Sequence, residues 1–332
     1  MFRPHRRERA AMPHSTRPSS GRVVTVGVHP HNPSLFVLRR LGVLEPMLAR
    51  LGAVVEWVEY DDGRCTIDLF AEAEIDFGGT GSMPPVQAQS EGVEIVYVAV
   101  SDPRPGRVAL VVPADSSIRT VADLRGRRVA MTDGSCHSEL LASVLESVGI
   151  GYHDIVVLDG NADENRSAFE SGEAEARVTG DPHVAEARRS GSLRVLAEAG
   201  AEIADRSVWW AGRAFAVAEP RLLETLVRAL RVSDAWAARH PREAAGLFAA
   251  GVPGSPDAAA WETALRRGPW GLRPVSADVV AEQQTAADRY VRLGMIPAPV
   301  SIADAVLAPV PALLGSAGPV VTAASASAYG TG

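Results

Sequence analysis

Residues 75–85, IDFGGTGSMPP, form the stretch on which the interpretation of the whole chain depends. A short apolar strand is predicted over 75–78, and a helix over 84–90 begins after three glycines in four positions, Ser82 and two prolines. Glycine adopts backbone conformations that other residues avoid, and it lets a main chain come close to a ligand. The stretch therefore predicts either a tight reversal of the chain or one wall of a binding cleft.

Short apolar strands alternate with helices on both sides of this turn. Strands are predicted over 23–28, 53–60, 94–100, 107–113, 128–132, 155–158, 174–179 and 193–197. Helices are predicted over 33–50, 67–73, 138–148, 164–171 and 182–189, and after residue 220 the pattern is mainly helical. This alternation is typical of an α/β architecture with largely parallel sheets.

The bulk composition excludes several classes of protein. The chain has 332 residues and is 46% hydrophobic, which suits a globular protein of about two domains. A net charge of −7 gives no broad basic surface, so no nucleic-acid partner is expected. All 33 basic residues are arginine, which excludes a lysine Schiff base and the lysine of a phosphate-binding P-loop.

The two ends of the chain are predicted to be tails, disordered over 1–21 and flexible over 309–332. No apolar stretch of about 7–15 residues follows the N-terminal charges, as a secretory signal would require. The sequence as it stands therefore predicts a cytoplasmic protein, and an extracytoplasmic one if the true N-terminus is missing. Cys65 and Cys136 are expected to be free thiols rather than a disulfide framework.

Three segments of the chain together carry a family resemblance. They are 74–92, EIDFGGTGSMPPVQAQSEG; 120–149, TVADLRGRRVAMTDGSCHSELLASVLESVG; and 233–305, which contains WAARHPREAAGLFA and AEQQTAADRYVRLGMIP and ends within VSIADAV. In combination they resemble the solute-binding proteins of ABC importers for sulfonates, nitrate and related small anions, and the third segment is similar to the aliphatic sulfonate branch. The resemblance covers roughly residues 22–308.

This resemblance implies a two-lobed α/β fold of the periplasmic-binding-protein type 2 class, with a hinge and an interlobe cleft. Lobe 1 would comprise 22–113 plus 213–308, and lobe 2 would comprise 114–212. The ligand would be a small organic anion, most of all a sulfonate, and the protein would be a monomer that works with an ABC permease. No cofactor and no metal are expected, because a His-x-His pair with a Cys-His pair is too loose a pattern for zinc.

The expected site lies at the carboxyl ends of the strands, where open α/β sheets bind ligands. Two helix N-termini, one from each lobe, would clamp the anion through their N–H groups and dipoles. The predicted ligand contacts are His29, His31, Asn32, Gly79, Thr80, Gly81, Ser82, Ser135, Cys136, His137 and Asp181. The alternative is that Ser82, Ser135 and Asp181 only cap the helices that follow them.

Titratable groups in these loops leave a second hypothesis open, a cytoplasmic enzyme on the same fold that acts on a sulfinate- or sulfonate-like substrate, as a desulfinase-like C–S lyase or as a biosynthetic enzyme. His29, Cys136 and His137 would be the catalytic residues of a desulfinase-type lyase or hydrolase, because a nucleophile and a base need such groups. Sulfinate desulfinases share this fold and the FGG turn found at 77–79, but their nucleophilic cysteine is replaced here by His29 and their arginine before the turn by Asp76. A cytoplasmic ligand sensor is the third alternative.

Overall fold

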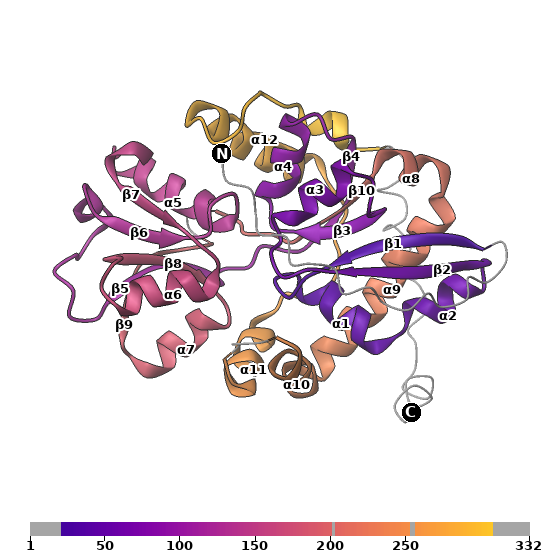
Figure 1. The fold of residues 1–332 in the computed structure, drawn as a ribbon, viewed down its shortest axis with the longest axis horizontal. Helices are drawn as coiled ribbons and strands as arrows, with labels where there is room; N and C mark the ends of the chain where they lie inside the picture. Colours follow the sequence, from indigo (N-terminus) through magenta and orange to yellow (C-terminus); the bar gives the residue numbers. More distant parts are fainter. Residues whose placement is uncertain (1–20, 201–202, 253–255, 308–332) are drawn as a thin grey trace.

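The computed structural model describes residues 21–200, 203–252 and 256–307. The two predicted tails lie outside that part of the chain, apart from Gly21. Figure 1 shows two lobes, each built on its own sheet, with the chain crossing between them. No helix in the described ranges is long and apolar enough to cross a bilayer.

The first sheet has five strands in the order β2 (Ala53–Glu59), β1 (Arg22–Val28), β3 (Phe77–Thr80), β10 (Val208–Gly212) and β4 (Ile95–Val100). β1 pairs in parallel with β2 and β3, whereas β10 is antiparallel to both of its neighbours. All six residues of β4 are buried, because helices cover both faces of the sheet.

Helices from distant parts of the chain cover the two faces of this sheet. One face packs mainly on α1 (Pro33–Leu41) and α9 (Pro220–Arg239), and the other on α3 (Cys65–Ala71), α4 (Met83–Ser90) and α12 (Ala277–Arg292). The first lobe also contains α2 (Leu44–Ala49), α8 (Arg213–Ala218), α10 (Pro241–Gly251), α11 (Ala258–Arg267) and the 3-10 turn η3 (Ile302–Ala305). The helix predicted over 33–50 is two helices, because Gly42 ends α1 in the left-handed conformation at φ 62°.

The second sheet also has five strands, in the order β7 (Val156–Asp159), β6 (Arg128–Met131), β8 (Ala176–Gly180), β5 (Val108–Pro113) and β9 (Leu193–Glu198). β6 is parallel to β7 and β8, and β5 is antiparallel to β8 and β9. The elements around this sheet are α5 (Cys136–Ser147), α6 (Ala162–Glu170), α7 (His183–Ser190) and the 3-10 turns η1 (Val121–Leu124) and η2 (Tyr152–Asp154).

The strand pairing corrects both predicted lobe boundaries. β5 was expected to close lobe 1, but it pairs within the second sheet. β10 was expected to close lobe 2, but it pairs within the first sheet. Each strand takes an interior position beside an edge strand, where both of its edges find backbone partners, so the chain crosses over 101–107 and again between the end of β9 and the start of β10. The predicted α/β, two-lobed fold is otherwise confirmed.

Candidate functional site

The two lobes contact each other along a seam, which is defined here by the hydrogen bonds and ion pairs that join one lobe to the other. The Ser82 hydroxyl, in lobe 1, donates to the Glu139 carboxylate on α5 of lobe 2. Arg64 reaches across to Asp159, with Nη1 3.2 Å from the carboxylate. Arg267 on α11 lies 2.5 Å from Asp181, and Arg289 and Arg292 on α12 pair with Glu146. The structure is therefore a closed arrangement of the lobes, with α11 and α12 beside the second lobe in Figure 1.

The loop after β1 is fixed by a capping residue and by a buried histidine. The Asn32 side chain caps α1 by accepting from Leu35 N. His29 Nε2 lies 2.8 Å from the Gly79 carbonyl oxygen, so Nε2 carries the proton and donates. Burial lowers the pKa of His29 to about 3, and the nearby His31 adds to the effect, so this imidazole is neutral.

The glycines of the opening stretch now have a physical explanation. A Cβ atom at Gly79 would lie 2.6 Å from Asn32 Nδ2 and 2.8 Å from Trp209 Cδ1. Gly79 is therefore required for close packing of β3 against its neighbours, and its carbonyl oxygen is taken by His29. A Cβ at Gly81 would come to 3.8 Å from Cys136 Cβ, which places this turn against the start of α5 in the other lobe. The turn thus lines the seam.

Arg107, in the first crossing segment, is a central residue that the sequence analysis did not select. Its Nη2 donates to the His31 carbonyl oxygen at 3.2 Å. Its positive charge contributes to lowering the pKa values of His29, His31 and His137, and it opposes the rise in the pKa of Cys136. One guanidinium can act on all four side chains only where the loops of both lobes converge. In the sequence, Arg107 simply follows a Pro-Gly pair, and nothing in residues 103–107 indicates that this arginine lies at a binding site.

His31 lies at the seam in a partly enclosed position. The residue is solvent-exposed, yet enclosure by protein lowers the pKa of its imidazole, and the charge of Arg107 lowers it further. Cys136 and His137 behave in the same way, since both are partly accessible and both have pKa values shifted first of all by desolvation. Side chains that water reaches but that protein surrounds are typical of a cleft lining.

The N-terminus of α5 is capped by residues of its own lobe. Ser135 Oγ accepts from His137 N at 3.1 Å and donates to the Thr132 carbonyl oxygen at 2.6 Å, so the predicted cap is confirmed. His137 Nδ1 accepts from Thr132 N at 3.3 Å. Burial and the charge of Arg177 lower the pKa of His137 to about 3, so the neutral ring carries its proton on Nε2. This N–H has no acceptor among the described residues.

Three other predicted contacts have partners of their own. Thr80 Oγ1 donates to the Gly81 carbonyl oxygen and accepts from Trp210 Nε1 at 3.2 Å. Ser82 does not cap α4, because its hydroxyl donates to Glu139 instead. Asp181 pairs with Arg267 and accepts from Ala185 N at 3.2 Å. Whether any of them touches a ligand stays a prediction.

The geometry offers hydrogen-bond donors and a cation rather than an activated nucleophile. Burial raises the pKa of the Cys136 thiol to about 12, with Asp205 adding to the effect, so the thiol is protonated near neutrality. No hydrogen bond in the described ranges joins Cys136 to His137, although a nucleophile and its base need such a contact. No group of three or more His, Cys, Asp or Glu residues in those ranges could hold a metal ion.

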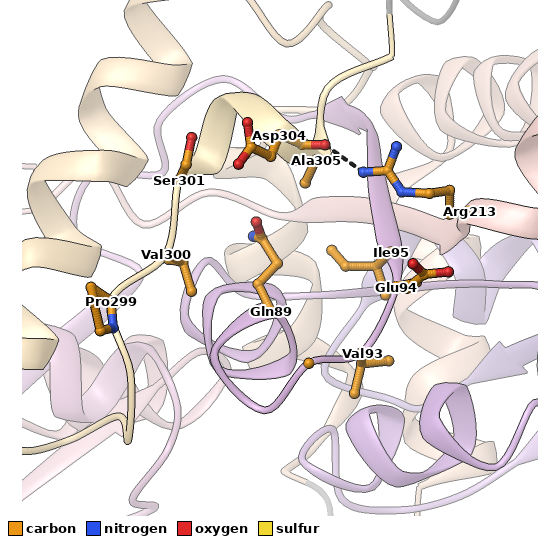
Figure 2. Close-up of a pocket in the computed structure, with 11 residues that line it drawn as sticks. Gln89, Val93, Glu94, Ile95, Arg213, Pro299, Val300, Ser301, Asp304 and Ala305 are labelled. Carbon is orange, nitrogen blue, oxygen red and sulfur yellow. Dashed lines mark hydrogen bonds between the residues drawn. The ribbon is translucent and has the colours of Figure 1, made fainter.

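A hollow lies on the first lobe, away from the seam. Figure 2 shows it between the end of α4, the start of β4 and residues 299–305, with a volume of about 320 Å³. Arg213 donates to the Asp304 carbonyl oxygen at its edge. None of the predicted site residues lines this hollow, and it lies at the opposite end of β4 from the crossing segment.

Comparison with known proteins identifies the family. Residues 49–244 match the model of the family described as NMT1/THI5 like. The chain belongs to the NMT1/THI5-like family. Among relatives of this family member, a protein of Escherichia coli K12 named as an aliphatic sulfonates-binding protein is 31% identical over 255 residues, which cover 77% of this chain and 80% of the relative. A Bacillus subtilis protein of the same name is 23% identical over 284 residues, 85% of each chain.

Solved structures agree with this family assignment. The alkanesulfonate-binding protein SsuA from Xanthomonas axonopodis pv. citri, bound to MOPS, is 29% identical with a TM-score of 0.78, covering 87% of this chain and 99% of that chain. The desulfurization enzyme DSZB, at 18% identity and a TM-score of 0.63, shows the fold alone. The resemblance of this NMT1/THI5-like protein to sulfonate-binding proteins is therefore confirmed.

Proposed function

We propose that this protein binds a small organic sulfonate in the seam between its lobes, as the solute-binding component of an ABC importer. The observation that carries the proposal is the position of Arg107, which donates to the His31 carbonyl oxygen of lobe 1 and directly precedes β5 of lobe 2. A half-buried cation at the point of convergence supports an anionic ligand, because it provides a charge-assisted hydrogen bond in a partly enclosed site.

The chemistry around Arg107 suits a sulfonate group. A sulfonate carries a single negative charge and presents three acceptor oxygens. His137 Nε2–H is a neutral donor, and the start of α5 adds the partial positive charge of a helix N-terminus. Histidines with pKa values near 3 stay neutral over the physiological range, so they supply hydrogen bonds without adding charge.

The relatives support the same ligand class. The MOPS molecule named in the structure of the Xanthomonas protein carries an alkanesulfonate as its anionic group. The names of the Escherichia coli and Bacillus subtilis relatives also refer to aliphatic sulfonates. Because these relatives align over 80% or more of their own length, the comparison covers both lobes rather than a fragment.

Binding would work by closure of the lobes over the anion. An anion held by Arg107 in the first crossing, by His137 of lobe 2 and by the His31 loop of lobe 1 would contact both lobes at once and would shift the population towards the closed form. The Ser82–Glu139 hydrogen bond and the Arg64–Asp159 pair would form in the same step, since each joins one lobe to the other. We further propose that the closed monomer is recognised by a membrane permease and that the working location is extracytoplasmic.

The test is calorimetric titration of the purified protein with methanesulfonate, ethanesulfonate, butanesulfonate and MOPS. We expect saturation near one equivalent, and at least about a tenfold loss of affinity in Arg107→Gln, since one charge-assisted hydrogen bond contributes roughly 1.5–3 kcal/mol. Arg127→Gln is the matched control, because Arg127 pairs with Glu175 far from the seam.

Two results would contradict the proposal. One is the absence of saturable binding for the whole sulfonate panel, and the other is equal affinity in Arg107→Gln and the wild-type protein. Proton NMR of the same mixtures tests the enzyme alternative, which requires the ligand to be consumed over hours.

A further inference from the structure

A buried ion cluster links the two crossing segments. Arg104, in the first crossing, donates from Nε to the Asp205 carbonyl oxygen and from Nη2 to Asp205 Oδ1, both at 2.8 Å. Its Nη1 donates to Ser207 Oγ at 2.8 Å. The Arg104 side chain is 6% exposed and that of Asp205 is 0% exposed. The cluster therefore ties the two crossing segments together, and it does so inside the protein, where charges are screened poorly.

The second oxygen of Asp205 faces Arg107. Arg107 Nη1 lies 3.6 Å from Asp205 Oδ2, and this buried oxygen has no hydrogen-bond partner among the described residues. Asp205 thus gives Arg104 a full hydrogen bond, but it offers Arg107 only an electrostatic contact. Arg107 keeps hydrogen-bonding capacity for another acceptor, beyond its bond to the His31 carbonyl oxygen.

The backbone of Asp205 is also unusual. Its φ of 44° lies in the left-handed region, which non-glycine residues rarely adopt. Residues held in such a conformation concentrate where the surrounding structure requires one side-chain placement. Here that placement puts one carboxylate between two guanidinium groups.

The charges of the cluster leave one positive charge in excess, since Arg104 and Arg107 oppose the single carboxylate of Asp205. Apart from Asp205, the groups that act most strongly on Arg107 already have partners or are neutral. Asp181 is held by Arg267, and His29, His31 and the Cys136 thiol carry no charge near neutrality. A singly charged anion would balance the excess, whereas a second negative charge would meet Asp205.

We infer that Asp205 is a positioning residue that holds Arg107 towards the cleft and restricts the site to singly charged anions. This inference rests on the proposed function. It predicts discrimination by charge between ligands of nearly the same shape, such as methanesulfonate and sulfate, whose charges of one and two do not change between pH 6 and pH 9.

The experiment compares the dissociation constants of methanesulfonate and sulfate at pH 8 and constant ionic strength. In the wild-type protein we expect methanesulfonate to bind at least about tenfold more tightly. Asp205→Asn keeps the shape, an acceptor oxygen for Arg104 and a residue type that tolerates positive φ, but it removes the negative charge. We expect sulfate to bind more tightly in this variant, and the preference for methanesulfonate to fall by at least about fivefold.

Two further variants make the test specific. Arg104→Gln removes a positive charge from the same cluster, so it should shift the preference in the opposite direction, further against sulfate. Asp234→Asn is the matched control, because Asp234 is also a buried aspartate, 1% exposed, but lies in lobe 1, where it accepts from Gly271 N at 2.9 Å outside the seam. Its preference should equal that of the wild-type protein. Thermal unfolding of every variant reports on folding.

The outcomes separate this inference from the proposed function. A wild-type protein that binds methanesulfonate and sulfate equally would overturn the inference and leave the proposed function standing. The inference would also be overturned if Asp205→Asn or Arg104→Gln lowered the affinity for both anions in parallel and left the preference unchanged. Absence of binding for every sulfonate tested would refute the proposed function, and the inference with it.

Discussion

Ser82 and Ser135 occupy matching places in the two lobes. Each follows a glycine-containing turn at the end of a parallel strand, and each directly precedes a helix that faces the seam. Ser135 has an extended backbone, with φ −132° and ψ −176°, and its hydroxyl caps α5. Ser82 has a helical backbone, with φ −71° and ψ −35°, and its hydroxyl crosses to Glu139 in the other lobe.

The difference shows that a serine before a helix is not a cap unless its backbone is extended. Only the extended conformation turns the side-chain oxygen back towards the N–H groups of the first turn. At α5 the serine therefore stabilises its own lobe. At α4 the same residue type joins the two lobes, and its contribution depends on closure. The following predictions test this contrast, beginning with the largest expected effect.

The pH dependence of binding should reveal the buried carboxyl group that Ser82 contacts. Desolvation raises the pKa of Glu139 from 4.5 to about 7 in the closed form. The negative charges of Asp205 and Glu282 also raise this pKa, and the hydrogen bonds from Ser82 and Tyr290 oppose the rise. A raised pKa means that the closed form binds the proton more tightly than the open form, so protonation favours closure. The contribution of Glu139 is complete below about pH 4.5 and is lost as the pH rises through 7.

Glu139→Gln isolates this contribution, because the histidines of the cleft titrate in both proteins. We expect the ratio of wild-type to variant affinity for ethanesulfonate to fall by at least about tenfold between pH 4.5 and pH 7 and to stay constant above pH 7.5. Calorimetric titrations across that range measure the ratio. A ratio that does not change with pH would mean that Glu139 keeps one protonation state in both forms.

Ser82→Ala should weaken binding with little effect on the stability of either lobe. The change removes the serine donor of the buried Glu139 carboxyl group in the closed form only, and removing one partner of a buried hydrogen bond costs roughly 1–3 kcal/mol. We expect about a tenfold loss of affinity for ethanesulfonate and a melting temperature of the ligand-free protein within about 2 °C of the wild-type value. Unchanged affinity would show that the contact with Glu139 does not stabilise closure.

Ser135→Ala should show the reverse pattern and the smallest change in binding. Loss of an N-cap typically costs about 1 kcal/mol of stability, so the melting temperature of the ligand-free protein should fall by about 2–4 °C. Affinity should change by less than about threefold, because the hydroxyl is already used within lobe 2. A larger loss of affinity without destabilisation would indicate that Ser135 contacts the ligand directly.

Local patterns predicted much of the fold. The alternation of strands and helices, the cap at Ser135 and the helix start after Asn32 depend on neighbouring residues, so they could be read from short stretches. The lobe boundaries could not be placed correctly, because β5 and β10 are ordinary apolar strands whose sheet is decided by their pairing partners. The convergence of His29, His31 and His137 likewise required the folded chain.

By itself, the sequence determined the class of the fold, the family resemblance and the loops that line the seam, since strand ends, glycine turns and helix starts are properties of contiguous residues. Only the tertiary structure decided which groups act together. Ser82 and Glu139 are 57 residues apart, and Arg104 and Asp205 are 101 apart. Their hydrogen bonds exist only when the lobes or the crossing segments lie side by side. The charge and protonation state of the cleft depend on that burial, because desolvation is the largest cause of the pKa shifts of His29, His137, Cys136 and Glu139.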